Sequence, residues 1–388
     1  MKIHITLNPR LRFGPFVWLL LSLMGIGLAV ALIRFAVGIG PISNLSNTYP
    51  WGFWISFDLF TGVAIGSGAF TMAAVVYIFE LKQFRPLVRP SVLTGFLGYI
   101  MVIISLMVDL GRPERIWHMI VYQNHTSVLF EIGICVMLYT TVLAVEFAPV
   151  FFEGIKWHKP AEWIHRWIMP FIILGVVLST LHQSSLGSLL LIQPQKLHPL
   201  WWTPFLPVMF FISAVSIGLA MVIFESSLSA RAFGRGLEIH LLEKLARAIP
   251  YVLSLYLILK FGEIFIAGDG KYLFTSGRMS VLFWAEILIG CVAPSVLFLF
   301  PKMRKSPAGL LGGAISLLLG MILNRFNVSW FAISRLNDVF YAPNWMEVSV
   351  SVAIFSAGIL AFGLAAKYLP LFEEQDPVNE SLLVVAGN

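Results

Sequence analysis

The sequence predicts an all-α integral membrane protein with about ten transmembrane helices. Three observations lead to this prediction: an apolar composition, ten apolar segments of membrane-spanning length, and an uneven distribution of Lys and Arg between them. Of the 388 residues, 58% are hydrophobic and 12% are charged. Charged residues make up about a quarter of an ordinary soluble domain, so the composition excludes that class.

The ten segments follow one another along the chain, and each is close to the ~20 residues needed to cross the hydrocarbon core. The first follows Lys2, Arg10 and Arg12 and has no small-residue cleavage site after it, so we expect it to be retained as an anchor. An even number of spans brings both termini to one side of the membrane. The expected spans are 14–37, 51–80, 91–110, 126–150, 164–190, 204–228, 245–266, 279–300, 307–326 and 347–367.

Lys and Arg indicate which side that is. The segments on the side of the termini together hold seventeen of them, whereas the segments on the other side hold six. The positive-inside rule therefore predicts that both termini are cytoplasmic. The net charge of +6 lies in short clusters between apolar segments, which indicates membrane topology and no nucleic-acid partner.

A short internal repeat predicts two related four-helix bundles with additional helices around them. The stretch 127-SVLFEIGIC-135 opens the fourth span and 280-SVLFWAEILIGC-291 opens the eighth, with the same orientation. We therefore divide the chain into an N-terminus (1–13), a first bundle (14–190), a second bundle (191–326), and a last span with a cytoplasmic tail (327–388). Gly62, Gly66 and Gly68 are expected to serve close helix packing.

Four ionisable groups from four successive spans are expected in the outer third of the membrane: Asp58, Asp109, Glu131 and His182. Helical spacing adds Trp51 and Trp54 to the face of Asp58, Ser127 and Cys135 to that of Glu131, and Ser179 and Ser185 to that of His182. Three carboxylates here meet one cation, Arg112, at the membrane edge. These residues predict a polar pocket with aromatic walls and incompletely neutralised charge.

The second half carries Lys260, Glu263, Glu286 and Arg325 at the same level. Two cations face two carboxylates there, which favours a neutralised structural network over a second functional site.

Near the inner ends of spans four and six lie Glu146 and Glu225. Each either pairs with a loop Lys or Arg or begins a proton route toward Glu131. Glu131 and Glu146 are ~22 Å apart along one helix, so water or other side chains would have to fill the gap.

No metal site is predicted. Cys135 and Cys291 are too far apart in sequence to form a CxxC motif. An intramembrane haem usually needs two facing histidines, and only His182 lies well inside a span, so we expect no haem.

Several segments together resemble the NrfD/PsrC family of quinone-interacting membrane subunits, over nearly the whole chain. They are 50-PWGFWISFDLFTGVAIGSGAF-70, 109-DLGRP-113, 127-SVLFEIGICVMLYTTVLAVEFAP-149, 181-LHQSSLGSLL-190, 197-LHPLWW-202, 223-IFESSL-228, 261-FGE-263 and 324-NR-325. Within the family the chain is similar to the HybB-type subunits of periplasmic respiratory NiFe-hydrogenases.

The resemblance implies a subunit of the bacterial inner membrane without a redox cofactor of its own. Such a subunit exchanges electrons between menaquinone or ubiquinone and a periplasmic ferredoxin-like iron–sulfur subunit, here expected with the large and small subunits of a NiFe-hydrogenase. The quinone site of the family lies near the periplasmic face of the first bundle, and the resemblance makes Glu131 essential for proton exchange. Related subunits serve sulfite-reduction-linked, high-molecular-weight cytochrome, polysulfide reductase and nitrite reductase complexes.

We assign roles on this basis. His182 and Asp109 hydrogen-bond the quinone oxygens, Arg112 and Ser185 complete the binding site, and Trp51 and Trp54 flank the ring or anchor the interface. Glu131 and Asp58 carry protons, with Asp109 and His182 as catalytic partners. The expected proton path contains Glu131, Glu146, Glu225, Glu263 and Glu286. Two other hypotheses stay open: a secondary transporter, whose carboxylates would bind a coupling ion, and a plain membrane anchor.

Overall fold

The computed structural model describes residues 14–46, 49, 51–192, 196–333 and 341–372 of the chain. Within these residues every regular element is a helix, and ten helical spans are long and apolar enough to cross a membrane, as the sequence predicts. Six spans are single helices: Pro15–Val37 (α1), Val128–Gly154 (α6), His158–Leu191 (α7), Leu206–Phe233 (α8), Ile239–Ile266 (α9) and Trp345–Tyr368 (α15). The chain is a multi-pass integral membrane protein.

The other four spans are composite. They consist of Trp54–Thr61 (η2), Gly62–Ile65 (α2), Gly68–Ala73 (α3) and Ala74–Ile78 (η3); Lys82–Leu87 (η4) and Val88–Asp109 (α4); Arg278–Ile287 (α11), Leu288–Val292 (η7) and Ala293–Leu299 (α12); and Pro307–Phe326 (α14) and Asn327–Phe331 (η8). Short helices in the connections are Gly40–Ile42 (η1), Pro113–Arg115 (η5), His118–Val121 (α5), Asp269–Lys271 (η6), Tyr272–Thr275 (α10) and Pro301–Arg304 (α13).

Some helices are longer than the sequence predicts. The clearest case is α7, which begins at His158 where hydropathy places the start near residue 164, and which has 34 residues. A helix of that length extends ~51 Å, far more than the ~30 Å of hydrocarbon. Hydropathy reports only the part inside the membrane, so the polar first turns of α7 were missed.

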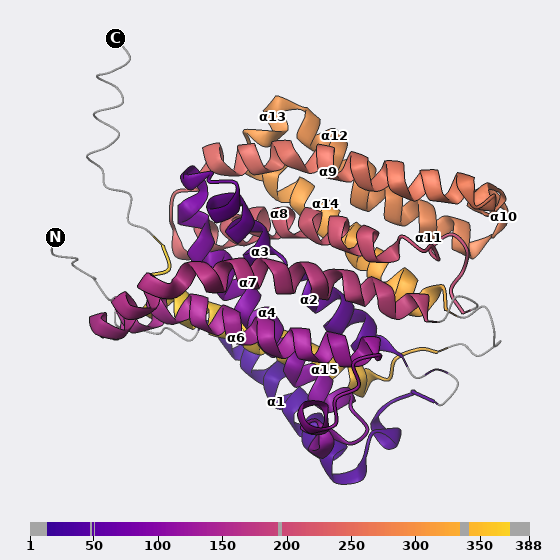
Figure 1. Ribbon diagram of the computed structural model, residues 1–388, viewed down its shortest axis with the longest axis horizontal. Coiled ribbons are helices and arrows are strands. Elements are labelled where there is room, and N and C mark those ends of the chain that lie inside the picture. Colours follow the sequence, from indigo (N-terminus) through magenta and orange to yellow (C-terminus); the bar gives the residue numbers. More distant parts are fainter. Residues whose placement is uncertain (1–13, 47–48, 50, 193–195, 334–340, 373–388) are drawn as a thin grey trace.

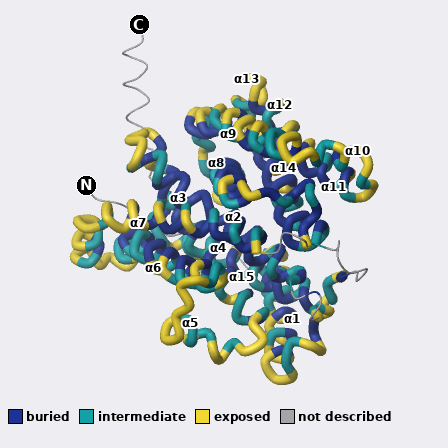
Figure 2. The backbone as a smooth tube through the Cα atoms, turned by 45° about the vertical axis from the view of Figure 1, so that its right-hand side comes forward, coloured by how far each residue is buried: buried dark blue, intermediate teal, exposed yellow. Residues whose placement is uncertain are grey.

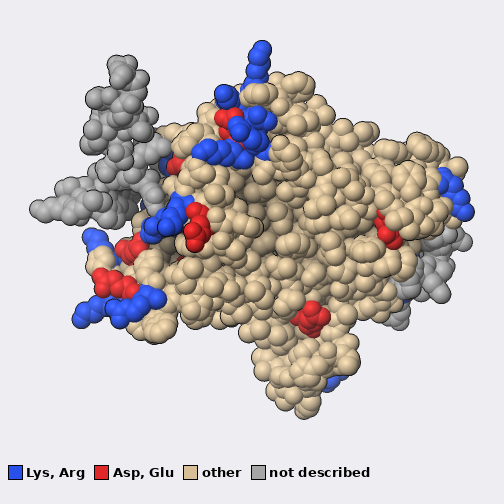
Figure 3. All heavy atoms as spheres, turned by 45° about the horizontal axis from the view of Figure 1, so that its top comes forward, with Lys and Arg blue, Asp and Glu red and all other residues tan. Residues whose placement is uncertain are grey.

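The long helices run along one common direction, so the molecule has two ends (Figure 1). We call the end where α1, α4, α7 and α9 begin the termini face, and the end where α6, α8, α11 and α15 begin the opposite face. Lys and Arg gather mainly toward the termini face, and a broad surface without charged residues lies between the two ends (Figure 3).

The helices pack in two groups. The first group consists of the span Trp54–Ile78 with α4, α6 and α7, and the second consists of α8, α9, the span Arg278–Leu299 and α14. Helix α8 packs against both groups, while α1 packs against α15 at one side. In the windows that identify the spans, 83% of Trp54–Ile78 and 72% of α8 are buried, against 17% of α1, so the core lies where the two groups meet (Figure 2). That the groups are duplicated bundles stays a prediction.

Glycines bring the span Trp54–Ile78 and α4 into close contact, as predicted. A Cβ added to Gly66 would lie 3.0 Å from the ring of Tyr99, and one on Gly62 would lie 2.8 Å from Val102. On the facing helix, a Cβ on Gly95 would lie 2.6 Å from Ala69. Small residues at such interfaces allow two backbones to approach closely, and this approach holds Tyr99 at a fixed position in the first group.

Four segments (η2, η3, η7 and η8) are π-helical. Their wider turns shift the direction in which the following side chains point, and such segments often occur at functional sites. Three of them carry buried polar or sulfur-containing side chains: Asp58 in η2, Cys291 in η7 and Asn327 in η8.

Candidate functional site

Glu131 lies in the first turn of α6, at the opposite face. The helix begins after Ser127, whose hydroxyl accepts a hydrogen bond from the backbone N–H of Phe130 (3.4 Å). The hydroxyl of Ser185, on α7, donates a hydrogen bond to the Glu131 carboxylate. Glu131 itself is exposed, whereas Ser185 is buried. The carboxylate therefore links the outside of the bundle to a buried hydroxyl, at a helix N-terminus that favours negative charge.

His182 lies three residues before Ser185 and therefore on the same face of α7. Its side chain is fully buried, and neither ring nitrogen has a hydrogen-bond partner among the described residues. The ring of Tyr99, from α4, packs beside it with 5.8 Å between the centroids. Buried polar atoms without a partner are rare, so this imidazole is placed to receive a hydrogen bond from a ligand or from water.

Further hydroxyls continue this line toward the termini face. The rings of Tyr99 and Tyr139 meet edge to face at 4.8 Å, and Ser179 lies three residues before His182 on α7. The hydroxyls of Tyr99, Tyr139 and Ser179 are all buried, and Ser179 lies within reach of both tyrosine hydroxyls, but none of the three forms a well-aligned hydrogen bond with a described residue. Each hydroxyl can both donate and accept, so together they can conduct a proton once water joins them.

The line ends at Glu146 of α6, seven residues beyond Tyr139. Gly175 of α7 makes room for this side chain, because a Cβ at Gly175 would lie only 2.8 Å from Glu146 Oε1. We call the set Ser185, His182, Tyr99, Ser179, Tyr139 and Glu146 the polar column. It occupies much of the gap that separates Glu131 from Glu146.

Asp58 lies in a second cluster, beside α15. Its Oδ2 accepts a hydrogen bond from the Ser351 hydroxyl (2.7 Å), and its Oδ1 has no well-aligned partner among the described residues. Ser105 of α4 lies beside Asp58, whereas Tyr99 of α4 faces the polar column. Tyr99 and Ser105 point about 120° apart on the helix. The four ionisable groups expected in one pocket thus divide into two sets.

Asp109 belongs to the same side as Asp58. It ends α4, is half-buried, and lies within electrostatic range of Asp58 and Arg34. The buried guanidinium of Arg34 donates to the backbone oxygens of Val108 (2.5 Å) and Leu110. A cation at the carboxyl end of a helix is favourable, so Arg34 fixes the end of α4 that carries Asp109.

The predicted aromatic walls have different surroundings. Trp54 is buried, and its Nε1 donates to the backbone oxygen of Glu347 (3.1 Å), so its side chain is held by α15. Trp51 is half-buried and packs against the main core. Arg112 is exposed in the segment after α4 and forms no ion pair with any described residue.

Glu347 joins α15 to the segment that precedes the span Trp54–Ile78. Its buried carboxylate accepts hydrogen bonds from the backbone N–H of Asn44 (2.8 Å) and Asn344 (3.0 Å) and from the Tyr341 hydroxyl. Burial, and then the hydrogen bond to Glu347, raise the pKa of Tyr341 well above its usual range. The phenol therefore stays protonated and keeps donating to the carboxylate.

In the second group, Glu286 is surrounded by neutral donors. Trp201 Nε1 (2.8 Å), Asn324 Nδ2 (2.7 Å) and Asn327 Nδ2 (2.8 Å) all donate to its carboxylate. Arg325 donates to Asn324 Oδ1 and to the Ser213 hydroxyl, each at 2.7 Å. The amide of Asn324 thus lies between the two charges. Lys260 and Glu263 are spaced to pair on α9, but among the described residues they form no ion pair.

Near the termini face, Glu225 of α8 is buried beside Ser229, and its Oε1 has no well-aligned partner among the described residues. Arg235, in the following connection, lies within its electrostatic range but not within ion-pair distance. Burial lowers the pKa of Arg235, and Glu225 and Glu238 oppose that change. Pairing with a loop cation therefore accounts for Glu225 only in part, and Glu146 forms no ion pair with any described residue.

Sequence reasoning missed several of these side chains. A Tyr in the middle of an apolar span is one usable signal, because a buried phenol needs a partner; it marks Tyr99 and Tyr139. The partners Ser351, Trp201, Asn324 and Asn327 depend on contacts between distant helices and have no local signal. Within the described residues, no group of three or more His, Cys, Asp or Glu side chains is arranged to hold a metal ion.

Comparison with known proteins gives consistent matches. The family model described as "Polysulphide reductase, NrfD" matches residues 41–334. A protein of Nitratidesulfovibrio vulgaris is 40% identical, over 90% of this chain and 92% of its own length. The probable Ni/Fe-hydrogenase 2 b-type cytochrome subunit of Escherichia coli is 33% identical, over 94% of this chain and 92% of its own. The menaquinone reductase integral membrane subunit of N. vulgaris is 30% identical, over 92% of this chain and 91% of its own.

Proposed function

This chain belongs to the NrfD family, and on that premise we propose that it is the membrane subunit of a respiratory oxidoreductase complex that exchanges electrons between a periplasmic iron–sulfur subunit and menaquinone or ubiquinone. The observation that carries the proposal is the fully buried His182, whose two ring nitrogens have no partner among the described residues, next to the hydrogen-bonded pair Ser185 and Glu131. The name of the menaquinone reductase relative supports the quinone as substrate.

Reduction of one quinone requires two electrons and two protons at the same place. His182 offers a ring N–H to one quinone oxygen, and Glu131 delivers protons through the Ser185 hydroxyl. The exposed position of Glu131 allows it to be recharged from the opposite face. The Asp58 and Asp109 cluster would support the site from the other side of α4, as a store of protons and as a positioning group.

Protons can also reach this site from the termini face. The polar column offers side chains that donate and accept between Glu146 and His182. We propose that the termini face is cytoplasmic, because it gathers the Lys and Arg residues. Protons taken up there and consumed near the periplasmic side would couple quinone reduction to the proton-motive force. Glu225, Glu263 and Glu286 remain further members of the proposed proton path.

A haem does not fit the described residues, although one relative is named a b-type cytochrome subunit. A haem between helices would need a second histidine facing His182. The ring that packs against His182 is that of Tyr99, while His118 packs against Trp117 and His165 pairs with Glu153. We therefore derive no electron-transfer step through a haem.

The first experiment identifies the partners. The tagged chain is purified from its host membrane and the co-purifying subunits are identified by mass spectrometry. We expect the large and small subunits of a NiFe-hydrogenase together with a ferredoxin-like subunit. Subunits of a polysulfide, nitrite or sulfite-linked reductase would change the partner and keep the quinone chemistry, whereas a chain that purifies alone would favour a secondary transporter.

The second experiment tests the quinone site. Binding of the quinol analogue 2-heptyl-4-hydroxyquinoline N-oxide to the purified complex is followed by fluorescence quenching. His182→Phe is expected to weaken binding at least tenfold, because the imidazole hydrogen bond is lost. His165→Phe is the matched control, since it changes a histidine of the same helix at the termini face. Equal affinity of His182→Phe and the unsubstituted protein would reject the site.

The third experiment tests the proton route. The complex is reconstituted in liposomes, and proton uptake is measured with a pH-sensitive dye during quinone reduction. Tyr139→Phe interrupts the polar column, so fewer protons should be taken up from the termini face per electron. Tyr251→Phe, a 74% exposed tyrosine on α9, is the control. An unchanged proton-to-electron ratio in Tyr139→Phe would show that protons take another route.

A further inference from the structure

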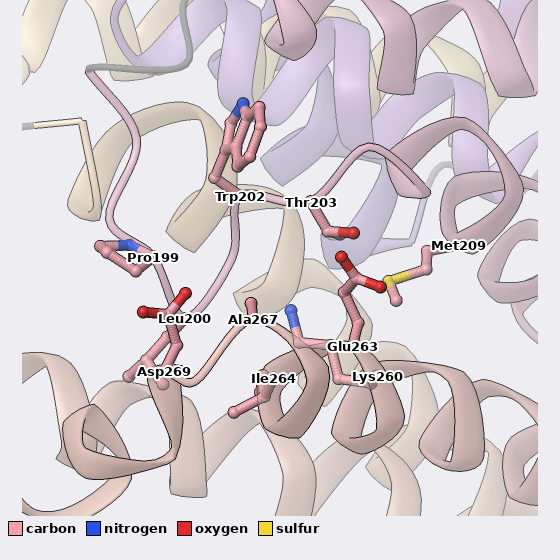
Figure 4. Close-up of a pocket in the computed structure, with 10 residues that line it drawn as sticks. All are labelled: Pro199, Leu200, Trp202, Thr203, Met209, Lys260, Glu263, Ile264, Ala267 and Asp269. Atoms are coloured by element: carbon pink, nitrogen blue, oxygen red, sulfur yellow. The ribbon is translucent and has the colours of Figure 1, made fainter.

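A small cleft opens at the opposite face between α8 and α9, outside the candidate quinone site. Thr203, Glu263, Ala267 and Asp269 line it, and its deepest polar residue is Lys260 (Figure 4). The centre of a water molecule can occupy a volume of ≈ 10 Å³ in this cleft, which is room for about one water molecule. The cleft is therefore suited to water and protons, and too small for a quinone.

A second space lies beside the first, within the second group of helices. It also has ≈ 10 Å³, and it is lined by Lys260, Tyr256, Asn324 and Arg325. Lys260 and Met209 line both spaces. Water in the two spaces would connect the opposite face with the Glu286 network and would pass Lys260 on the way.

Lys260 is a buried residue of this region whose charge is not balanced by contacts with the described residues. It is 2% exposed, no described residue binds its ammonium group as a hydrogen-bond acceptor or ion-pair partner, and its Nζ lies 5.6 Å from the ring centre of Phe283. The buried carboxylate of Glu286 already accepts hydrogen bonds from three neutral donors. A buried ammonium without an acceptor is costly unless water reaches it or its proton leaves.

The charges around Lys260 act in opposite directions. Glu263 on α9, Asp269 on η6 and Glu286 on α11 favour the ammonium, whereas burial and Arg325 on α14, which is always protonated, oppose it. Tyr256 on α9 and Cys291 on η7 are the other titratable groups nearby. A lysine held in such a balance can change its protonation state when the charge of one neighbour changes.

We propose that this cleft is a water-filled half-channel for protons, and that Lys260 is its proton-loading group. A proton from the opposite face passes Asp269 and Glu263 and is taken up by the Lys260 amine, which becomes an ammonium; in the reverse step the ammonium returns the proton to water. No electron moves in either step. This inference rests on the proposed function, because quinone turnover would supply the change of charge that loads and unloads Lys260.

Access of water is tested in intact spheroplasts with Ag⁺, a thiol-reactive cation close in size to a water molecule, because a cysteine that binds Ag⁺ is protected from later alkylation of the unfolded protein. Cysteines are introduced singly into a variant in which Cys135 and Cys291 are replaced by Ala. Met209→Cys, at the junction of the two spaces, should be protected, whereas Ile258→Cys, a 69% exposed position near Lys260 on the outer side of α9, should face lipid and stay unprotected. An unprotected Met209→Cys would overturn the half-channel, whatever the partner or substrate of the protein.

Proton loading is tested in liposomes with the whole complex. Lys260→Met and Lys260→Arg should both lower the number of protons moved per electron at least twofold, because neither side chain exchanges a proton. A purely structural cation would be rescued by Arg, so a normal ratio in Lys260→Arg would overturn the proposal, as would a normal ratio in Lys260→Met. Thermal unfolding in detergent separates misfolding from loss of exchange. If the unsubstituted complex fails to reduce quinone, the proposed function fails, and the Ag⁺ protection result still decides on the cleft.

Discussion

The two groups of helices differ in how far their buried polar atoms are hydrogen-bonded within the protein. In the first group, both nitrogens of His182 lack a partner among the described residues, and the hydroxyls of Tyr99, Tyr139 and Ser179 lie near one another without a well-aligned hydrogen bond. In the second group, the Glu286 carboxylate receives three donors, and Arg325 is bound through Asn324 and Ser213. Arg325 Nε and Asn327 Oδ1 have no partner among the described residues, and Lys260 has no acceptor there, but the Glu286 carboxylate and the Arg325 guanidinium are held by direct hydrogen bonds.

The difference indicates which region is prepared for an exchangeable ligand. A satisfied network stabilises one arrangement of helices and leaves little for a substrate to bind. An unsatisfied one carries a free-energy penalty that is relieved when a quinone or water enters. One copy of the short repeat, at the start of α6, contains Glu131, and the other copy, in α11, contains Glu286. The Glu131 carboxylate is exposed beside one serine, whereas the Glu286 carboxylate is enclosed by three donors.

The largest effect is expected from Glu131→Gln. The substitution keeps the size of the side chain and removes the group that exchanges protons, so quinone-linked turnover in membranes should fall ~10²–10⁴-fold, as for the loss of a general acid or base. Glu153→Gln, on the same helix but paired with Arg89 (3.1 Å) at the termini face, should leave turnover within about twofold of the unsubstituted protein. Full activity of Glu131→Gln would place the proton-exchanging group elsewhere.

Arg325→Met should cause the largest loss of stability. It removes a fully buried cation and leaves Asn324 Oδ1 and the Ser213 hydroxyl without their donor. Breaking such a buried charged network typically lowers the free energy of unfolding by ~3–5 kcal/mol, which denaturant titration in detergent would measure. Arg247→Met, which removes an exposed Arg paired with Glu243, should change it by less than ~1 kcal/mol. Similar losses in the two variants would contradict the view of the second group as a rigid network.

Trp201→Phe should have a smaller effect on the same network. The indole N–H is one of three donors to Glu286 (2.8 Å), and the ring is fully buried. Losing a hydrogen bond to a buried charged group typically lowers stability by ~1–3 kcal/mol. Denaturant titration is again the measurement, and Trp202→Phe, whose Nε1 has no partner in the described residues, is the control. If both variants lose equal stability, the indole hydrogen bond contributes nothing measurable.

The spans were predictable from the sequence because hydropathy and length follow from the thickness of the bilayer. The ionisable residues of the proposed site in the first group were predictable as well. A charged or imidazole side chain inside an apolar span is costly, so each one is expected to have a partner or a function; Glu131, His182 and Glu146 were singled out in this way. Their grouping was not. Whether Asp58 shares a pocket with His182 depends on the direction in which α4 presents Tyr99 and Ser105. The glycine pattern predicts close packing, but it does not show which face of α4 takes part in it.

The start of α7 and the neighbours of Glu286 were missed for related reasons. The polar turns of α7 outside the membrane carry no hydropathy signal. Asn324, near the end of α14, and Asn327, at the start of η8, both donate to Glu286 of α11, and a contact between helices distant in sequence is not visible in composition.

Tyr99→Phe is expected to have the smallest effect on stability, and it tests the comparison most directly. The Tyr99 hydroxyl is fully buried and lies near Ser179 without a well-aligned hydrogen bond, so its removal takes away a poorly satisfied group and leaves the ring contacts with Tyr139 and His182 in place. The free energy of unfolding should then change by less than ~1 kcal/mol or increase, in contrast to Trp201→Phe. The same variant should lower proton uptake per electron in liposomes, because the polar column loses one hydroxyl. A loss of stability larger than that of Trp201→Phe would mean that Tyr99 is bonded within the protein, and that the two groups do not differ in the way their polar atoms are satisfied.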